Sequence, residues 1–301
     1  MSKVISESDY MKKTYVFAGL AILFWSSVAT VSKLLLNTLG SYQVLMYSAL
    51  FAALALFVIN LATGKLKLFK EYRFKDYIIM TLIGLPGTFF YYVFYYLGTA
   101  RMSASQAFII NYLWPIMSVV FACILLGEKL TVRKCIAFVL SFLGVLTVAG
   151  EDILNFNAQS LIGIGLCAIA AVSYGLFTAL GRKWKYDDGI SLMLSCLSSA
   201  FLSFLINIFS GGSFVAKPLE ILGFAWNGVF VMAIATFLWA LALRSGGTAK
   251  VSNLAYITPF LSLVWTRLIL DEPIKPLSVV GLVIIVVGIF IQMGPSKKKI
   301  K

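Results

Sequence analysis

The stretch Asn111-Tyr112-Leu113-Trp114-Pro115 interrupts an apolar run that extends from residue 102 to residue 126. Proline lacks a backbone N–H, and its ring crowds the carbonyl four residues earlier, so a helix is expected to break here. The carbonyl that loses its partner needs another one, which restricts such breaks to places surrounded by protein or by a watery cavity. The stretch therefore predicts a broken membrane helix beside a cavity.

The same pattern returns 144 residues later, where Pro259 follows Tyr256 inside a second apolar run. The same interval separates Glu128 from Glu272, the acids that follow the two runs. Other pairs at this offset are Tyr112/Tyr256, Ser118/Ser262 and Gly144/Gly288. One shared offset predicts two related halves, residues 14–149 and 159–293.

Apolar residues make up 60% of the 301 residues and charged residues 12%, which is typical of a polytopic membrane protein. Windows of about 20 apolar residues, enough to cross a hydrocarbon core of about 30 Å, recur along the chain. The ten predicted helices cover residues 14–37, 41–62, 76–98, 102–126, 132–149, 159–181, 190–210, 219–242, 247–270 and 277–293. The predicted fold is thus an all-α membrane protein. Because each half holds an odd number of helices, the second half enters the membrane upside down, as in transporters built from inverted repeats.

The placement of Lys and Arg predicts the orientation of the chain in the cell (inner) membrane. With a cytoplasmic N-terminus, the inner loops and tails carry 20 of these residues and the outer loops carry three. This asymmetry places both termini in the cytoplasm. It also explains the net charge of +13 without a nucleic-acid partner, so the expected partners are the lipid bilayer and a small-molecule substrate. The oligomeric state is left open, and a monomer is compatible with the sequence.

Several kinds of chemistry are absent from the sequence. There is no His, the four Cys lack CxxC spacing, and no Walker motif is present. None of the twelve acidic residues falls in the middle of a predicted helix, so the buried relay that proton-coupled exporters of cations use is missing. We expect no catalytic residue, metal or cofactor, and movement of a neutral or zwitterionic substrate down its gradient. A proton relay through water or tyrosine is the alternative.

Taken together, these features resemble the EamA-like drug/metabolite transporter superfamily. The resemblance rests on the ten spans, on the 5+5 repeat, on Phe24-Trp25-Ser26-Ser27 with Lys33, and on the acidic motifs at residues 127–129 and 271–273. The motif at residues 111–115 is similar to that of bacterial aromatic amino-acid exporters. The resemblance implies export of small metabolites through a central aromatic cavity. Those exporters tend to carry Trp in the sixth helix, where this sequence offers Tyr174, and this departure leaves the substrate open.

The candidate substrate-binding residues combine aromatic rings with one carboxamide. They are Trp25, Tyr91, Tyr95, Asn111, Tyr112, Trp114 and Tyr174. The alternative for Trp25 is plain packing. For the run of aromatic residues at 89–96 it is an interfacial belt, which suits Tyr96 best. Asn111 either binds a polar group of the ligand or ties helices together.

Charged residues at the helix ends have structural interpretations. Glu128 and Glu272 are expected to cap a helix N-terminus or to pair with a basic loop residue such as Lys129 or Arg133. Lys33 and Arg267 lie near the outer ends of their helices, where long side chains snorkel to the interface or attract a carboxylate in the cavity.

Three functions fit this pattern. The first is an alternating-access exporter of amino acids, aromatic or otherwise neutral. The second is an exporter of other metabolites or lipophilic drugs on the same fold. The third is a passive channel or a membrane scaffold, for which matched broken helices are an unexpected feature.

Overall fold

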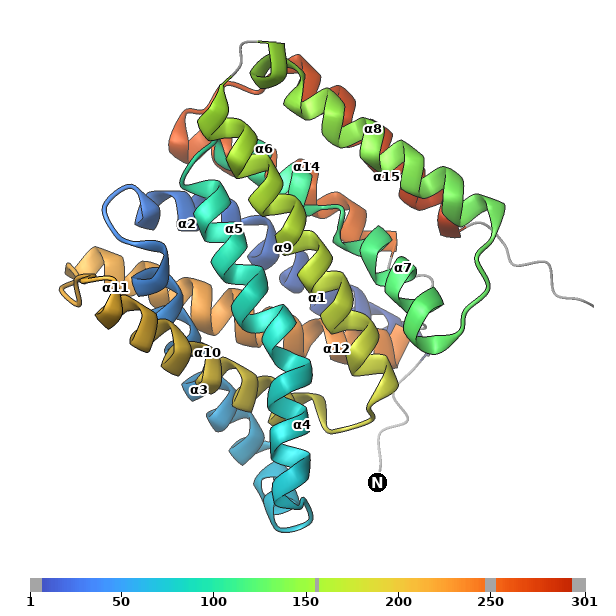
Figure 1. Cartoon of the computed structure of the whole chain (residues 1–301). Coiled ribbons are helices and arrows are strands. Elements are labelled where there is room, and N and C mark those ends of the chain that lie inside the picture. The colour runs from blue at the N-terminus through green and yellow to red at the C-terminus, as the bar shows by residue number, and fades with distance from the viewer. Residues whose placement is uncertain (1–6, 155–156, 247–252, 294–301) are drawn as a thin grey trace, which may run out of the picture.

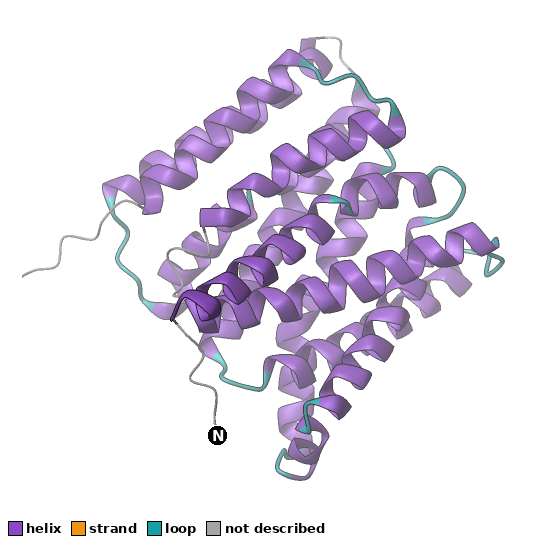
Figure 2. Ribbon diagram, turned by 180° about the vertical axis from the view of Figure 1, so that it is seen from behind, coloured by secondary structure: helices purple, strands orange, loops and turns teal. Residues whose placement is uncertain are grey.

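The computed structural model describes residues 7–154, 157–246 and 253–293, and every regular element within them is helical (Figure 2). The elements of the first half are α1 (Glu7–Ser26), α2 (Val28–Leu36), α3 (Ser41–Ala62), η1 (Lys65–Lys70), α4 (Phe74–Leu85), η2 (Pro86–Phe90), α5 (Tyr91–Thr99), α6 (Ala104–Asn111), α7 (Trp114–Leu126) and α8 (Val132–Leu154). Those of the second half are α9 (Ala158–Lys183), α10 (Asp188–Phe209), α11 (Pro218–Ala225), η3 (Trp226–Ile234), α12 (Ala235–Gly246), η4 (Asn253–Ile257), α14 (Thr258–Leu270) and α15 (Pro276–Met293).

Eight helical segments of the described chain are long and apolar enough to cross a membrane. They are Lys13–Leu36, Ser41–Ala62, Phe74–Thr99, Ala104–Leu126, Val132–Gly150, Ala158–Lys183, Asp188–Phe209 and Pro218–Ala242. Two shorter apolar helices follow, Thr258–Leu270 and Pro276–Ile291. The predicted segment 247–270 begins outside the described residues. The described chain thus has an all-helical architecture with several segments that can cross a membrane.

The first predicted segment is not one continuous helix, because α1 and α2 are separated at Ser27. The Ser26 and Ser27 hydroxyls donate to the carbonyls of Leu23 and Phe24, at 2.8 and 2.7 Å. Serine hydroxyls that bond back to the preceding turn bend helices. Here the same hydroxyls also accept the indole N–H of a tryptophan from another element, Trp265 for Ser26 and Trp226 for Ser27. These contacts fix the bend.

Two further helices carry a wide turn in their middle. The π-helical segment η2 joins α4 to α5, and η3 joins α11 to α12. Pro86 begins η2 and accounts for its irregularity, but the sequence of η3 holds no proline and gave no sign of it. Such turns inside α-helices are frequent at functional sites, and both segments contribute to the cavity described below.

The helices pack in pairs that combine the two halves (Figure 1). α3 lies along α10, α7 along α9, α1 along α12, and α8 lies beside α15 at one edge of the molecule. Glycine permits the last pair to approach closely. A Cβ added to Gly144 would lie 2.8 Å from the Gly281 carbonyl, and one added to Gly281 would lie 2.6 Å from the Gly144 carbonyl. Small residues that bring two backbones together are a common means of helix association in membranes.

Acidic residues stand at the starts of several helices rather than in their middles. Asp76 accepts the backbone N–H of Arg73 at 2.8 Å, and Glu220 accepts that of Lys217 at 2.6 Å. Asp187 accepts two N–H groups of the first turn of α10. Each carboxylate satisfies donors that a helix leaves unpaired and lies at the positive end of the helix dipole.

Candidate functional site

The site is built around two helix breaks. Asn111 ends α6 and Trp114 begins α7, while η4 gives way to α14 at Thr258. Pro259 leaves the carbonyl of Ala255, four residues earlier, without its helical donor. The Tyr112 hydroxyl donates to that carbonyl and so joins the two breaks directly. The freed carbonyl of the second break thus finds its partner on the first.

Between the breaks lies a cavity. The described residues that line it are Trp25, Val28, Gly87, Thr88, Tyr91, Tyr92, Phe108, Asn111, Tyr112, Trp114, Tyr174, Phe177, Leu192, Cys196, Val231, Met232, Thr236, Trp239, Ala255 and Thr258. Six of the seven predicted site residues are among them, and Tyr95 is not. Their role in binding stays a prediction, but the structure does bring these six side chains together.

Aromatic rings form the walls. Trp25 lies against Trp239 with ring centroids 5.3 Å apart. On another wall, Tyr174 contacts Trp114 edge-on at 5.1 Å and Tyr91 at 4.9 Å. Rings packed at such distances hold one another in place and leave their other faces available for an aromatic or cationic group.

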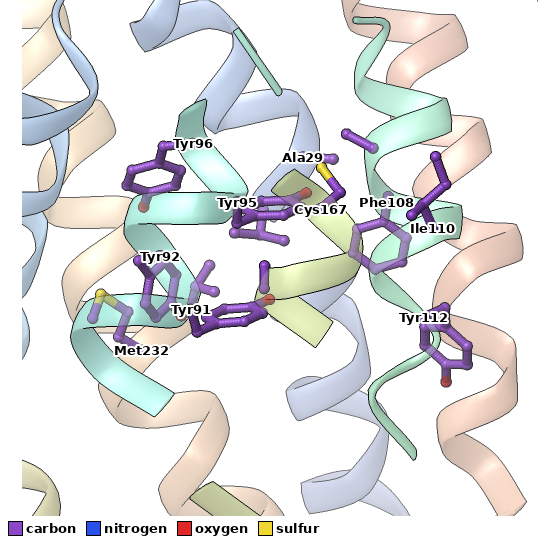
Figure 3. Close-up of a cluster of buried hydrophobic side chains, with 14 of the residues drawn as sticks. Ala29, Tyr91, Tyr92, Tyr95, Tyr96, Phe108, Ile110, Tyr112, Cys167 and Met232 are labelled. Carbon is purple, nitrogen blue, oxygen red and sulfur yellow. The ribbon is translucent and has the colours of Figure 1, made fainter. Parts of the chain in front are cut away.

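The tyrosines of α5 divide between the cavity and the protein interior (Figure 3). Tyr91 lines the cavity, and the ring of Tyr95 is stacked above it at 5.8 Å and 3°. Tyr95 and Tyr96 are both fully buried, with 0% of their surface exposed. The interpretation of Tyr96 as an interfacial belt residue is therefore wrong. Neighbouring helices enclose the Tyr96 side chain, so its ring does not face lipid.

The cavity wall is uncharged. No Asp, Glu, Lys or Arg lines it among the residues that the structure describes. Its most polar side chain is that of Asn111, which is 4% exposed and donates through Nδ2 to the Tyr91 hydroxyl at 2.9 Å. Asn111 therefore ties α6 to α5, as one of its two interpretations proposed, and it also borders the cavity. A charged ligand would find no counter-ion here, whereas a neutral or internally neutralised one needs none.

A second cavity adjoins the first. The two share Phe177, Leu192, Thr236 and Trp239 in their walls. The second cavity is also lined by Lys65 of η1 and by residues of the α9–α10 turn, and we call it the vestibule. These four shared residues stand between the central cavity and the vestibule.

Several residues of the central cavity were not among the predicted site residues. Trp239, Phe177 and Thr236 were not predicted, although all three border both cavities. They are ordinary residues of apolar helices, so composition and spacing do not mark them. Gly87 lies against Phe177, since a Cβ added at position 87 would lie 2.3 Å from the Phe177 ring. That information is spatial and lies outside the reach of the sequence.

Glu272 caps a helix, as predicted. Its carboxylate accepts the Ala104 N–H at 2.8 Å and the Ser105 N–H at 3.1 Å, at the start of α6. Lys33 does not snorkel. Its Nζ donates to the carbonyls of Thr99 and Met102, at 2.9 and 2.6 Å, because α5 ends there with unpaired acceptors. A cation and an anion thus hold the two ends of the connection between α5 and α6.

Glu128 pairs with basic residues, as one of its two interpretations proposed. Its partners are Arg182 at 2.7 Å and Lys134 at 3.1 Å, rather than the Lys129 and Arg133 named as examples. Hydrogen bonds from Arg182 and then Lys134 hold the pKa of the Glu128 carboxyl below its ordinary value. Arg267 pairs with Asp271 at 2.5 Å and stays exposed.

Comparison with known proteins agrees with this architecture. The family model described as the EamA-like transporter family matches the chain twice, over residues 12–150 and 161–293. The chain belongs to the EamA-like transporter family. Members of this family are membrane transporters, so this EamA-like protein is a transporter and not an enzyme.

Relatives of this EamA-like chain include two uncharacterized transporters. One, from Clostridium kluyveri, is 24% identical over 96% of this chain and 95% of that protein. Another, from Archaeoglobus fulgidus, is 26% identical over 93% and 98%. The aromatic amino acid exporter YddG of Ancylobacter novellus is 25% identical over 60% of this chain and 63% of that protein. A solved crystal structure with 20% identity matches 93% of the chain with a TM-score of 0.68, which shows a shared fold.

Proposed function

We propose that this transporter exports small neutral or zwitterionic metabolites, with aromatic amino acids as the leading class. One observation carries the proposal. Trp25, Tyr91, Asn111, Trp114 and Tyr174 meet in a single uncharged cavity between two helix breaks. Binding sites at the breaks of discontinuous helices are typical of secondary transporters. The relation to an aromatic amino acid exporter supports the same substrate class.

We further propose that transport follows alternating access between two five-helix halves, residues 14–149 and 159–293, of opposite orientation. Support comes from the matched features of α7 and α14. Both helices begin with a proline in their first turn, and both end at a residue in the left-handed conformation, Gly127 and Asp271. The backbone N–H groups of Glu128 and Glu272 donate to corresponding carbonyls, those of Ala122 and Thr266. These correspondences fall at the interval of 144 residues noted in the sequence.

The proposed location is the inner membrane, with both termini in the cytoplasm. The vestibule then faces the cytoplasm, because η1 and the α9–α10 turn belong to the Lys- and Arg-rich loops. A substrate would enter the cavity past Phe177 and Trp239. Since the cavity wall carries no acid or base, we propose movement of the substrate down its own gradient without an obligatory proton antiport.

Proteoliposomes test this function. Vesicles loaded with labelled Phe, Trp or Thr should show saturable transport, and unlabelled substrate on the far side should accelerate it by counterflow. Counterflow distinguishes a carrier from a passive channel. Transport of no amino acid would contradict the proposal. A thermal-shift screen would then identify another metabolite or a lipophilic drug, because a ligand that binds the folded state raises its melting temperature.

The tryptophans of the cavity give a matched pair of variants. Trp25→Ala and Trp114→Ala should each reduce transport at least about tenfold, since each removes a ring that a substrate would contact. Trp226→Phe is the control. Trp226 lies outside the cavity lining. Its substitution removes the bond to Ser27 and reduces, but does not abolish, its ring contacts with Phe24 and Phe230. Parent-like transport by both alanine variants would show that the substrate binds elsewhere.

A further inference from the structure

Two buried polar atoms of the central cavity have no hydrogen-bond partner. They are Oδ1 of Asn111 and Oγ1 of Thr258, on side chains that are 4% and 3% exposed. Buried polar groups in native proteins are nearly always paired, so an unpaired one calls for a specific reason. Both residues stand at the helix breaks, Asn111 at the end of α6 and Thr258 at the start of α14. A ligand in the cavity is the partner that their position provides for.

The Asn111–Tyr91 pair presents both a donor and an acceptor to the cavity. Nδ2 of Asn111 donates to the Tyr91 hydroxyl at 2.9 Å, which leaves Oδ1 as an acceptor and the proton of the hydroxyl as a donor. If the Asn111 carboxamide is rotated by 180°, Asn111 and Tyr91 exchange the roles of donor and acceptor. Nδ2 then offers donors, and the Tyr91 oxygen keeps a free lone pair. In either orientation the pair offers one donor beside one acceptor.

We propose that Asn111 and Tyr91, together with Thr258, form the polar subsite that recognises the substrate's α-amino and α-carboxylate groups. An amino acid carries an N–H donor and an oxygen acceptor on the same carbon, which matches the donor and acceptor of the pair. Its two charges neutralise each other, as a cavity wall without Asp, Glu, Lys or Arg requires. The aromatic walls hold the side chain. This inference rests on the proposed function and adds the chemical feature by which the cavity selects.

Four probes that share a phenyl ring separate the contributions. They are L-phenylalanine, phenethylamine, 3-phenylpropionate and the neutral amide 3-phenylpropionamide. Their affinities are measured on the purified full-length protein in nanodiscs by calorimetry. The amine and the acid each leave one member of the pair unpaired and bring an unbalanced charge. We expect them to bind at least about tenfold more weakly than phenylalanine and the amide. Equal affinity for all four probes would overturn the subsite.

Substitutions of Asn111 test the assignment to this residue. Asn111→Leu keeps the approximate volume and removes the amide, so phenylalanine and the neutral amide should each lose at least about tenfold in affinity. Their advantage over the two charged probes should narrow, because only the charge penalty then remains. Asn111→Asp, studied at about pH 8, supplies acceptors and a negative charge. The Asn111→Asp variant should bind phenethylamine at least about tenfold more tightly than the parent does. It should bind 3-phenylpropionate more weakly. A gain of affinity cannot arise from misfolding, so this variant remains informative if Asn111→Leu folds poorly.

Asn227→Leu is the matched control. Asn227 is likewise a buried asparagine whose Oδ1 has no partner, and its Nδ2 donates to the Ser32 hydroxyl outside the central cavity. Its variant should keep the parental order of the four affinities. If Asn111→Leu separated the neutral from the charged probes by the same affinity ratio as the parent, the proposal would be overturned.

The outcomes also separate the subsite from the proposed function. Binding of the amide without binding of phenylalanine would uphold the subsite and contradict amino-acid export. Transport of phenylalanine with unchanged discrimination in the Asn111 variants would uphold export and overturn the subsite. Failure of all four probes to bind the parent would contradict both.

Discussion

At the scale of single residues, the cavity shows which side chains a sequence can reveal. Asn111 and Trp114 stand out because a carboxamide and a tryptophan beside a proline are costly within hydrocarbon. Trp239 and Phe177 do not stand out, because any apolar helix holds such residues. The sequence alone also does not separate the exposed positions of α5 from its buried ones. Tyr96 is enclosed by neighbouring helices, and only the tertiary packing places it there.

The Tyr112 hydroxyl gives the first stability prediction. Tyr112→Phe removes the donor to the Ala255 carbonyl, which Pro259 has already deprived of its helical donor. A fully buried carbonyl left unpaired costs about 1–3 kcal/mol, and this partly buried one should cost about 1 kcal/mol. Thermal unfolding in detergent should therefore show a lower melting temperature for this variant.

The control for Tyr112→Phe is Tyr15→Phe, which removes a hydroxyl from a side chain that is 46% exposed. This variant should unfold like the parent. Equal melting temperatures for Tyr112→Phe and the parent would show that another group or water replaces the lost donor.

At the scale of helices, the sequence predicts where the membrane segments lie. It predicts only some of the breaks, bends and wide turns inside them. The segment Ser41–Ala62 coincides with its prediction, because an uninterrupted apolar run leaves little choice. Prolines marked the breaks before α7 and α14. The bend at Ser27 and the wide turn η3 depend on partners from other helices, such as Trp226 and Trp265. Local sequence contains no information about these partners.

The cap of α6 predicts a loss of stability in Glu272 variants. The carboxylate accepts two backbone N–H groups and the Ser105 hydroxyl at 3.0 Å. Glu272→Ala removes all three bonds and the charge at the helix N-terminus, so we expect a loss of about 1–2 kcal/mol. Glu272→Gln should retain part of the stabilisation. Thermal unfolding checks the order parent, Gln, Ala, and equal stability of the three would refute the cap.

The link between α7 and α9 predicts a dependence on pH. Arg182 and Lys134 lower the pKa of Glu128, so the ion pairs stabilise the folded state above the ordinary pKa of the carboxyl. This stabilisation disappears as the pH falls through the lowered value. The difference in melting temperature between the parent and Glu128→Gln should be present near neutral pH and vanish in acid. A difference that persists at all pH values would show that the charge of Glu128 contributes nothing.

At the scale of the whole molecule, the chain is an all-helical transporter whose orientation the proposal fixes. Lys67 lies on η1 and Ser213 in the α10–α11 loop, and both are exposed. In a background without the native cysteines, Lys67→Cys should react with a membrane-impermeant thiol reagent only in inside-out vesicles. Ser213→Cys should react only in intact cells or right-side-out vesicles. The opposite pattern would invert the proposed topology.

The bond between Tyr112 and Ala255 has a consequence for how such chains diverge. Tyr112 contributes a side chain, whereas position 255 contributes only its backbone carbonyl. Substitutions at position 255 therefore leave the acceptor in place, and those at position 112 remove the donor. Among descendants of one ancestral gene, this bond should retain tyrosine at the first position while placing no constraint of its own on the side chain at the second. Correlated substitution between the two positions would not reveal this contact, although it joins the breaks on which the cavity depends.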